Sequence, residues 1–528
     1  MKNPVYVTPV TIPKGNGKNM TRRNFMSSCA ACAACWTIAP FMLVNFSHTS
    51  VKAAGKMKIR ILYSLHAEVQ PLPDWPNIGY DFKPAMERIN AALINHFPDF
   101  EFISSLATGA EDAKKIVEED KKEPIDGYIV YQMNCWNQVI QTIAGTGKPV
   151  LYADYQFAGS GGFLVYNSQL LDDKSRNVGF VASSRIEDLL AAVSCFYIVN
   201  RGGSTSEFVA ATVKARFEST PEPGKFSMLP NNLNTLSPDE CIRRLKNSRI
   251  LAVTDQNAGI DDPVMGIPLE YITFAEINEA WKIADMDEAA TVVERWHKSA
   301  AAITDISDET LMTSAAMYLG MKSVLKKHDA NAITVNCLGG FYGGHIHAYP
   351  CLGFHELCNE GLVGACECDV RSAATMLAFN TMTNGRPGFI SDPVIDTSKR
   401  QIIYAHCVAP NRVFGPQGPA NPFRIMTHSE DRQGASVRSI LPLNYLTTTL
   451  EINNENREIL FHQAVAVDND TDDRACRTKL CAEPKGDMEK LFTMWNKWGW
   501  HRVTFYGDLK EPVYALADAM GWKVIEET

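Results

Sequence analysis

The 528-residue sequence predicts an α/β fold, in which two doubly wound, Rossmann-like α/β domains precede a β-rich C-terminal domain. Strand-like and helix-like segments alternate over residues 57–205, a pattern typical of a parallel sheet with helices on both faces. The alternation restarts after a linker-like stretch rich in Gly, Pro and Ser, residues 201–234. From residue 386 onward, strand-like segments are joined by turn-rich loops. The predicted domains are therefore 57–205, 206–385 and 386–528.

Residue type and periodicity predict the individual elements. In the first domain these are the strand Lys58–Ser64, the helix Lys83–Phe97, the strands Ile125–Met133 and Lys148–Ala153, and the helix Ile186–Asn200. A capping box at Ser237–Glu240 opens the second domain, which continues with strand Arg249–Thr254, helix Asp308–Lys327, and strands Ala332–Leu338 and Leu362–Glu367. The third contains strands Gln401–Cys407, Ile459–Asp468 and His501–Tyr506, and helix Glu511–Gly521.

Residues 1–53 have the order of segments found in an export signal. Thr21–Met26 contains paired arginines and resembles the twin-arginine motif. An apolar run, Ser27–Phe46, and a small-residue cleavage site at Val51–Ala53 follow. The run is nearly long enough to anchor the chain in a membrane, but it contains Pro40 and several small residues. We expect cleavage, an exported, periplasmic protein, and no stable membrane span afterwards.

Charge excludes one class of partner. The whole chain has a formal net charge of −9, and residues 1–53 contain Lys and Arg but no Asp or Glu, so the mature chain is more acidic still. An acidic protein is a poor partner for nucleic acid. We therefore expect a small-molecule partner.

Acidic and histidine side chains gather in residues 356–406. The apolar strand Leu362–Glu367 ends on a carboxylate, Asp392 follows a loop, and His406 ends the next strand. Acids are rarely buried unless they are paired or bind a metal, and side chains at strand ends can converge. Two carboxylates plus imidazole suit Mn²⁺ or another borderline divalent ion.

Three motifs resemble the L-fucose isomerase family. They are Leu362–Asp369 with the helix after it, the turn Asn384–Pro387 followed by Ser391–Asp392, and Trp500–Asp508 near the C-terminus. The resemblance spans about residues 57–528. It implies that Glu367, Asp392 and His501 bind the metal, most simply Mn²⁺, and that Glu367 and Asp392 also act as acid and base. It further implies aldose–ketose isomerisation through an enediolate, and we expect a homo-oligomer.

Other residues near these motifs have two interpretations each. His406 would touch metal or substrate, or be a hydrogen-bonded structural residue. His345 and His347 alternate in a glycine-rich loop and would touch substrate, or simply belong to a mobile loop. Trp500 would stack on a sugar ring, although tryptophan usually packs in cores. Asp369 is better explained as a helix cap than as a ligand.

The predicted export leaves three functions open. The first is the sugar isomerase implied by the resemblance. The second is an exported glycoside hydrolase or lyase that uses the same carboxylates on a saccharide. The third is a sugar-binding protein without catalysis, because paired α/β domains can clamp a ligand between them.

Overall fold

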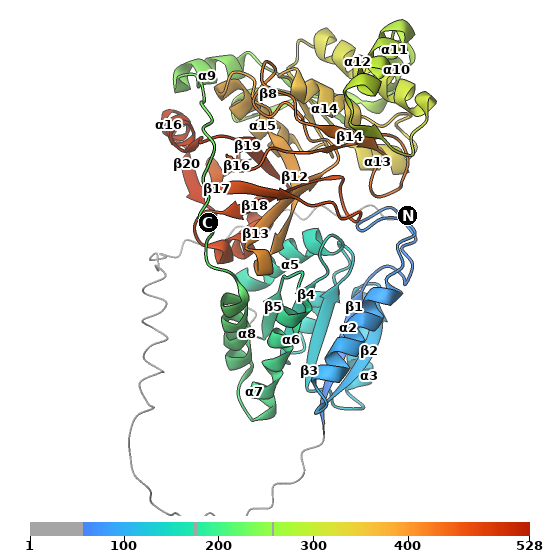
Figure 1. Cartoon of the computed structure of the whole chain (residues 1–528), viewed down its shortest axis with the longest axis vertical. Helices are drawn as coiled ribbons and strands as arrows, with labels where there is room; N and C mark the ends of the chain where they lie inside the picture. The colour runs from blue at the N-terminus through green and yellow to red at the C-terminus, as the bar shows by residue number, and fades with distance from the viewer. Residues whose placement is uncertain (1–55, 174–176, 256–257) are drawn as a thin grey trace, which may run out of the picture. The chain divides into compact units, whose positions relative to one another are not determined.

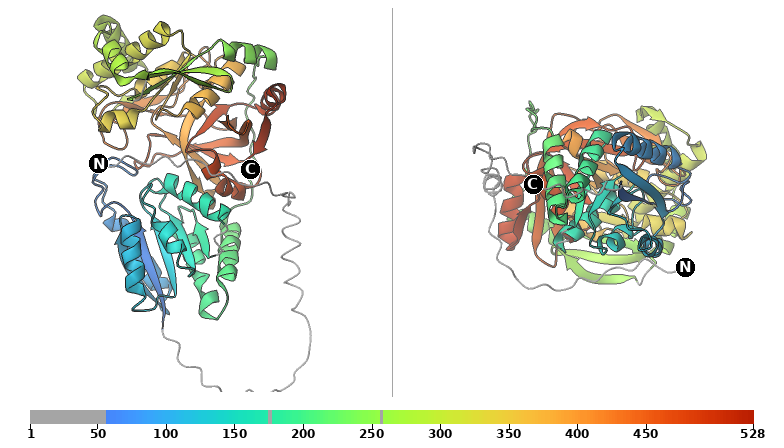
Figure 2. Two further views of the ribbon diagram at one scale, coloured as in Figure 1. Left: turned by 180° about the vertical axis from the view of Figure 1, so that it is seen from behind. Right: turned by 90° about the horizontal axis from the view of Figure 1, so that it is seen from below.

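The computed structural model describes residues 56–173, 177–255 and 258–528. Two mainly parallel sheets and an antiparallel barrel organise these residues, with the barrel lying between the sheets (Figures 1 and 2). The predicted export signal, residues 1–53, lies outside the described residues. In the part of the chain that is described, no helix has the length and apolar character needed to cross a bilayer.

The first sheet has the strand order β2-β1-β3-β4-β5, and its neighbouring strands are all parallel. Side chains of α2, α6 and α8 pack on one face, and those of α3, α4 and α5 pack on the other. The predicted parallel sheet with helices on both faces is therefore confirmed. The strands are β1 (Met57–Ser64), β2 (Phe100–Ala107), β3 (Gly127–Gln132), β4 (Val150–Asp154) and β5 (Val178–Val181). The helices are α2 (Lys83–His96), α3 (Ala110–Asp120), α4 (Val139–Ala144), α5 (Ser160–Asp172), α6 (Ile186–Ser194), α7 (Phe196–Asn200) and α8 (Thr205–Ser219).

Helix α8 lies inside the predicted linker, residues 201–234, so that prediction is wrong for its first half. Ser204 and Glu207 form a reciprocal capping box at the start of α8, and the glycines before it lead into a helix. Only the rest of the stretch is extended. It crosses the barrel, where the Gly224 amide donates to Glu483 Oε1 (2.7 Å) and the Leu229 amide donates to the Asn444 carbonyl (2.7 Å).

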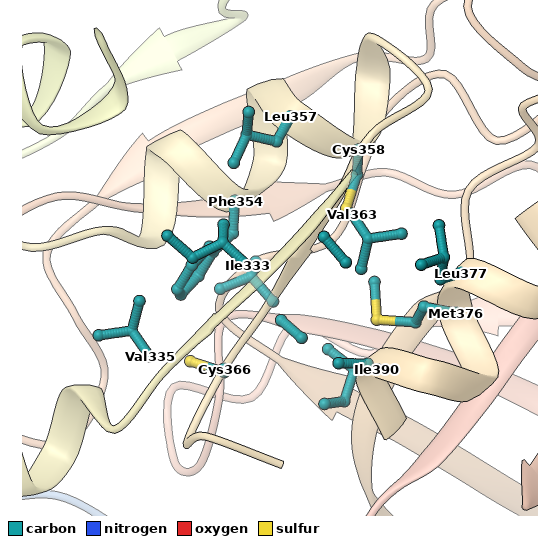
Figure 3. Packing of buried hydrophobic residues seen from close by; sticks show 14 of the residues in the cluster. Ile333, Val335, Phe354, Leu357, Cys358, Val363, Cys366, Met376, Leu377 and Ile390 are labelled. Carbon is teal, nitrogen blue, oxygen red and sulfur yellow. The ribbon is translucent and has the colours of Figure 1, made fainter. Parts of the chain in front are cut away.

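The second sheet has the order β11-β10-β6-β8-β7, and only its edge strand β7 is antiparallel to its neighbour. The short strand β11 is surrounded by apolar side chains of α14 and α15 (Figure 3). The strands are β6 (Ile250–Thr254), β7 (Gly259–Val264), β8 (Ile267–Thr273), β10 (Ala332–Val335) and β11 (Val363–Ala365). The helices are α9 (Pro238–Lys246), α10 (Phe274–Lys282), α11 (Met286–Ser299), α12 (Asp308–Lys327), α13 (Cys337–Tyr342), α14 (Cys351–Asn359) and α15 (Val370–Met382).

The C-terminal part forms a closed antiparallel barrel, β16-β19-β12-β13-β18-β17, in which β17 pairs back with β16. This confirms a β-rich C-terminal region, whereas the limits of the three domains remain a prediction. The strands are β12 (Phe389–Asp396), β13 (Gln401–His406), β16 (Leu446–Asn453), β17 (Glu458–Asn469), β18 (Thr478–Pro484) and β19 (Arg502–Tyr506). Strand β20 (Lys523–Glu526) follows α16 (Lys510–Met520) and pairs with β17, and a small sheet joins β9 (Ala302–Ile303), β14 (Phe423–Met426) and β15 (Ser436–Ser439).

Candidate metal centre

Four side chains that lie in or next to four different strands meet at one end of the barrel. Glu367 follows β11, Asp392 lies in β12, His406 ends β13, and His501 immediately precedes β19. One potential ligand atom from each lies within 4.8 Å of those of the other three. The three predicted metal ligands are thus brought together, and His406 joins them. Their roles remain predictions.

A turn places Glu367, and here the sequence prediction is wrong. Strand β11 ends at Ala365, and Glu367 (φ +63°) and Cys368 (φ +52°) both adopt the left-handed conformation. Each such residue is strained by about 1–2 kcal/mol. The turn is held because the Cys368 amide donates to the Val335 carbonyl (2.9 Å). Strand alternation therefore does not govern this segment, and the turn directs the Glu367 carboxylate toward the barrel.

Three polar atoms of the group lie close to one another without hydrogen-bond partners among the described residues. His501 Nε2 is 3.1 Å from Asp392 Oδ1 and 3.5 Å from Glu367 Oε2. His406 Nε2 is 3.9 Å from both carboxylates. Asp392 Oδ1, His406 Nε2 and His501 Nε2 are buried, and none has a partner of hydrogen-bond geometry among the described residues. Buried orphan atoms of this kind need an explanation, and a cation supplies one. Two carboxylates and imidazole nitrogen fit a borderline divalent ion.

His501 is prepared to offer a lone pair to a cation. Its Nδ1 lies 2.9 Å from Asp369 Oδ2. A carboxylate only accepts, so Nδ1 carries the proton and Nε2 is left unprotonated in the neutral ring. Burial by itself would raise the pKa of Asp369, but the hydrogen bond and charge of His501 outweigh it and bring that pKa below its ordinary value. Asp369 also accepts from the Ser372 amide (3.0 Å), which confirms its predicted role as the cap of α15.

His406 has the opposite arrangement. Its Nδ1 accepts a hydrogen bond from the Cys407 amide (2.9 Å), so a neutral ring carries its proton on Nε2. Burial lowers the pKa of His406, which favours the neutral ring. The nitrogen that faces Glu367 and Asp392 is therefore a donor. This geometry suits His406 to a hydrogen bond with a substrate oxygen better than to metal ligation.

Aromatic side chains flank the centre on the side of the first sheet. The ring of Trp500, next to His501, packs against that of Trp136 in a tilted arrangement, with ring centroids 4.5 Å apart. Trp136 has a positive φ of +59° and is 49% exposed. It was missed in the sequence, because nothing in a loop after a strand indicates contact with a segment more than 360 residues away. The ring of Trp500 occupies the space that a side chain at Gly161, in the first turn of α5, would need.

The structure does not bring His345 and His347 into this group. Both lie in the loop between α13 and α14 and are exposed. The ring of His345 stacks on Phe274 (5.7 Å), and that of His347 lies near Trp281 (5.9 Å). The segment is not a strand, so the predicted alternation is wrong. A role for these histidines in substrate binding stays a prediction.

Comparison with known proteins gives partial matches to sugar isomerases. No family model matches the chain. Over 281 residues the chain is 24% identical to the sulfoquinovose isomerase of Clostridium sp. (strain MSTE9). The aligned segment covers 48% of this chain and 57% of that protein. It is 26% identical over 160 residues to the sulfoquinovose isomerase of Priestia aryabhattai, covering 30% of this chain and 34% of that protein. The matched segments thus span between a third and somewhat more than half of these relatives.

Changing Asp369 should affect the metal centre through His501. We expect Asp369→Ala to weaken Mn²⁺ binding on the order of 10- to 100-fold, because the imidazole loses the acceptor that fixes its proton and orientation. Asp369→Asn keeps one of the two accepting oxygens, enough for His501 or for the Ser372 amide but not for both, so its Mn²⁺ affinity should fall less than that of Asp369→Ala. Titration of Mn²⁺ followed by electron paramagnetic resonance measures both. Equal affinities for Asp369→Ala and wild type would contradict this role.

A buried carboxyl behind Asp369 makes stability depend on pH. Glu451 accepts hydrogen bonds from the hydroxyls of Ser372 and Thr375 (2.9 Å each), and burial raises its pKa from 4.5 to about 8. A raised pKa stabilises the fold below pH 4.5, and this contribution is lost as the pH rises to about 8. In metal-free protein, the unfolding free energy of wild type should therefore fall relative to that of Glu451→Gln between pH 5 and 8. The difference should change by up to about 1.4 kcal/mol per pH unit. Urea unfolding at several pH values measures it, and parallel curves would refute it.

Proposed function

We propose that this chain is a metal-dependent aldose–ketose isomerase. The observation that carries the proposal is the group Glu367, Asp392, His406 and His501, whose buried orphan atoms fit a divalent cation. The names of the partial relatives support the same reaction class. We propose an aldose as substrate, with sulfoquinovose, the sugar in those names, as the first candidate.

The reaction moves one proton from C2 to C1 and one from the C2 hydroxyl to the C1 oxygen, so no atom is gained or lost. A divalent cation held by Glu367, Asp392 and His501 would polarise the sugar's carbonyl and hydroxyl oxygens. The carboxylate of Glu367 or Asp392 takes the proton from carbon and returns it to the neighbouring carbon. His406 donates through Nε2 to a sugar oxygen, and Trp500 with Trp136 offers an aromatic face to the sugar.

The geometry favours this proposal over hydrolysis. The candidate ligand oxygens of Glu367 and Asp392 lie within 4.8 Å of each other, with an imidazole nitrogen beside both. His501 Nε2, which has no hydrogen-bond partner in the described part of the chain, lies 3.1 Å from Asp392 Oδ1 and 3.5 Å from Glu367 Oε2. An imidazole nitrogen beside two carboxylates suits a shared cation, whereas hydrolysis needs two carboxyl groups that flank a glycosidic bond. No observation specifically supports a hydrolase, a lyase or a non-catalytic sugar-binding protein.

A direct test incubates the chain from residue 56 onward with Mn²⁺ and a panel of aldoses that includes sulfoquinovose, L-fucose and L-arabinose. We expect one aldose to be converted to its ketose, which NMR identifies. Treatment with a chelator should stop the conversion, and added Mn²⁺ should restore it. Absence of ketose from every aldose, with Mn²⁺ shown to be bound, would refute the isomerase.

We also propose export by the twin-arginine route, on the strength of the motif at Thr21–Met26. Expression of the whole chain and of an Arg22→Lys, Arg23→Lys variant in a bacterium with this route, followed by fractionation, tests it. The wild-type chain should be periplasmic and the variant cytoplasmic.

A further inference from the structure

Three successive carbonyl groups just before β19 are all held by side chains of the barrel region. Arg502 Nη1 donates to the Gly499 carbonyl (3.2 Å) and to the His501 carbonyl (2.9 Å). Trp495 Nε1 donates to the carbonyl between them, that of Trp500 (3.3 Å). These hydrogen bonds therefore fix the backbone that carries the imidazole of His501 and the ring of Trp500.

Arg502 is itself held by a fully buried partner. Its guanidinium pairs with Glu527 (Nη2 to Oε1, 2.8 Å), and the side chains of both residues are 0% exposed. The guanidinium also lies over the ring of Trp495, 4.0 Å from its centroid. Glu527 is the penultimate residue of the sequence. Glu527 thus anchors a side chain that donates to the backbone carbonyl of His501, a residue of the candidate metal centre.

The same carboxylate continues the network to the strand of the other histidine. Glu527 Oε2 lies 2.8 Å from His462 Nδ1, and His462 Nε2 lies 2.6 Å from the hydroxyl of Tyr404. Tyr404 precedes His406 by two residues on β13, so the two side chains share one face of the strand. The Arg502 carbonyl, in addition, accepts from the hydroxyl of Ser391 (3.1 Å), the neighbour of Asp392.

Stability alone is a weak reason for such a network. Removing an arginine and a glutamate from water costs several kcal/mol per ion, and well-packed apolar residues often stabilise a fold as well or better. A buried arginine–glutamate pair does, however, hold its two side chains in one geometry, because two-pronged hydrogen bonds permit few other orientations of the guanidinium. At this place, the fixed geometry is that of residues 499–501.

We propose that Arg502, anchored by Glu527, is a positioning residue that pre-orients His501 for a divalent cation; this rests on the proposed metal-dependent function. In its absence the segment 499–501 would have more freedom, and cation binding would have to order it. Neutralising the anchor should therefore weaken cation affinity even though neither residue touches the cation.

The test compares two Glu→Gln variants of the chain from residue 56 onward. Glu527→Gln neutralises the anchor. Glu489→Gln neutralises the partner of Arg216, a second buried arginine with a two-pronged ion pair (2.6 Å), whose hydrogen bonds go to Glu489 and the Phe180 carbonyl instead of to residues 499–501. The Mn²⁺ dissociation constant is measured by electron paramagnetic resonance at a temperature where each variant is folded. The absorption spectrum of the Co²⁺-loaded protein reports the coordination geometry.

We expect Glu527→Gln to raise the Mn²⁺ dissociation constant about 10- to 100-fold and to change the Co²⁺ spectrum. Glu489→Gln should lower the melting temperature but leave both readouts within twofold of wild type. Equal Mn²⁺ affinity in wild type and Glu527→Gln, or an equal loss in both variants, would overturn the proposal while leaving the proposed function standing. If wild type does not bind Mn²⁺, both the positioning role of Arg502 and the proposed metal-dependent function are overturned. If Glu527→Gln does not fold, Tyr404→Phe decides: a smaller rise in the constant supports the proposal, and an unchanged constant overturns it.

Discussion

Replacing His501 by alanine should remove most of the stabilisation that Mn²⁺ gives to the folded protein. In the neutral ring that binds a cation, Nε2 of His501 is free of a proton, because Nδ1 donates to Asp369. At 100 times its dissociation constant, Mn²⁺ should stabilise wild type by about 2.7 kcal/mol. If loss of this ligand raises the constant about 100-fold, the same Mn²⁺ concentration gives only about 0.4 kcal/mol. Melting with chelator and with Mn²⁺ measures the difference.

The readout is the rise in melting temperature that Mn²⁺ causes, because the substitution of His501 also changes the stability of the metal-free protein. Burial alone would lower the pKa of His501, but the charges of Asp392 and Glu367 and the hydrogen bond that His501 donates to Asp369 hold that pKa well above its ordinary value. The substitution therefore removes a buried, protonated imidazole from the metal-free fold as well as a ligand from the metal-bound fold. A variant that melts at a lower temperature but retains the full shift with Mn²⁺ would contradict ligation by His501.

His406→Ala is the matched comparison, since both histidines are buried and their rings lie 5.6 Å apart. The Nε2 proton of His406 makes it a donor, so we expect the Mn²⁺ shift to remain nearly complete while the Michaelis constant for the sugar rises. Loss of the shift in both variants would show that His406 is a fourth ligand and that its ring takes the other tautomer when the cation is bound.

Much of the centre could be predicted from the sequence because its residues sit beside apolar strands. Glu367 and His501 each adjoin a buried strand and Asp392 lies within one, and side chains at strand ends can converge. Their separations in the sequence, 25 residues (392 − 367) and 109 residues (501 − 392), do not indicate that the three side chains meet. The choice among many acids and histidines therefore came from the resemblance to a known family.

The features that were missed depend on contacts between distant segments. Asp369 follows a turn with two positive φ values, and that turn, not strand alternation, brings its carboxylate to His501. Arg502 alternates with apolar residues in an ordinary strand pattern, and nothing local indicates that the penultimate residue would neutralise it. Helix α8 was overlooked because the glycines before its cap resemble a linker. In each case the deciding partner is far away in the sequence or specific to one backbone geometry.

Replacing Glu367 by glutamine should abolish most of the isomerase activity while preserving the fold. Glutamine has the same shape and tolerates the left-handed backbone about as well, but it can neither take a proton from carbon nor contribute negative charge to a cation site. Loss of a general acid–base group lowers turnover by about 100- to 10,000-fold. Measuring kcat at saturating Mn²⁺ and sugar separates this effect from weaker cation binding.

Glu356→Gln is the control for losing a buried glutamate elsewhere. Glu356 is 7% exposed and accepts a hydrogen bond from Trp296 Nε1 (2.6 Å), outside the metal centre. This variant should lose stability and keep a kcat close to that of wild type. If Glu367→Gln binds Mn²⁺ and retains a wild-type kcat, Glu367 is not the proton carrier. That role would then fall to Asp392, the other carboxylate of the group, and Asp392→Asn should show the loss instead.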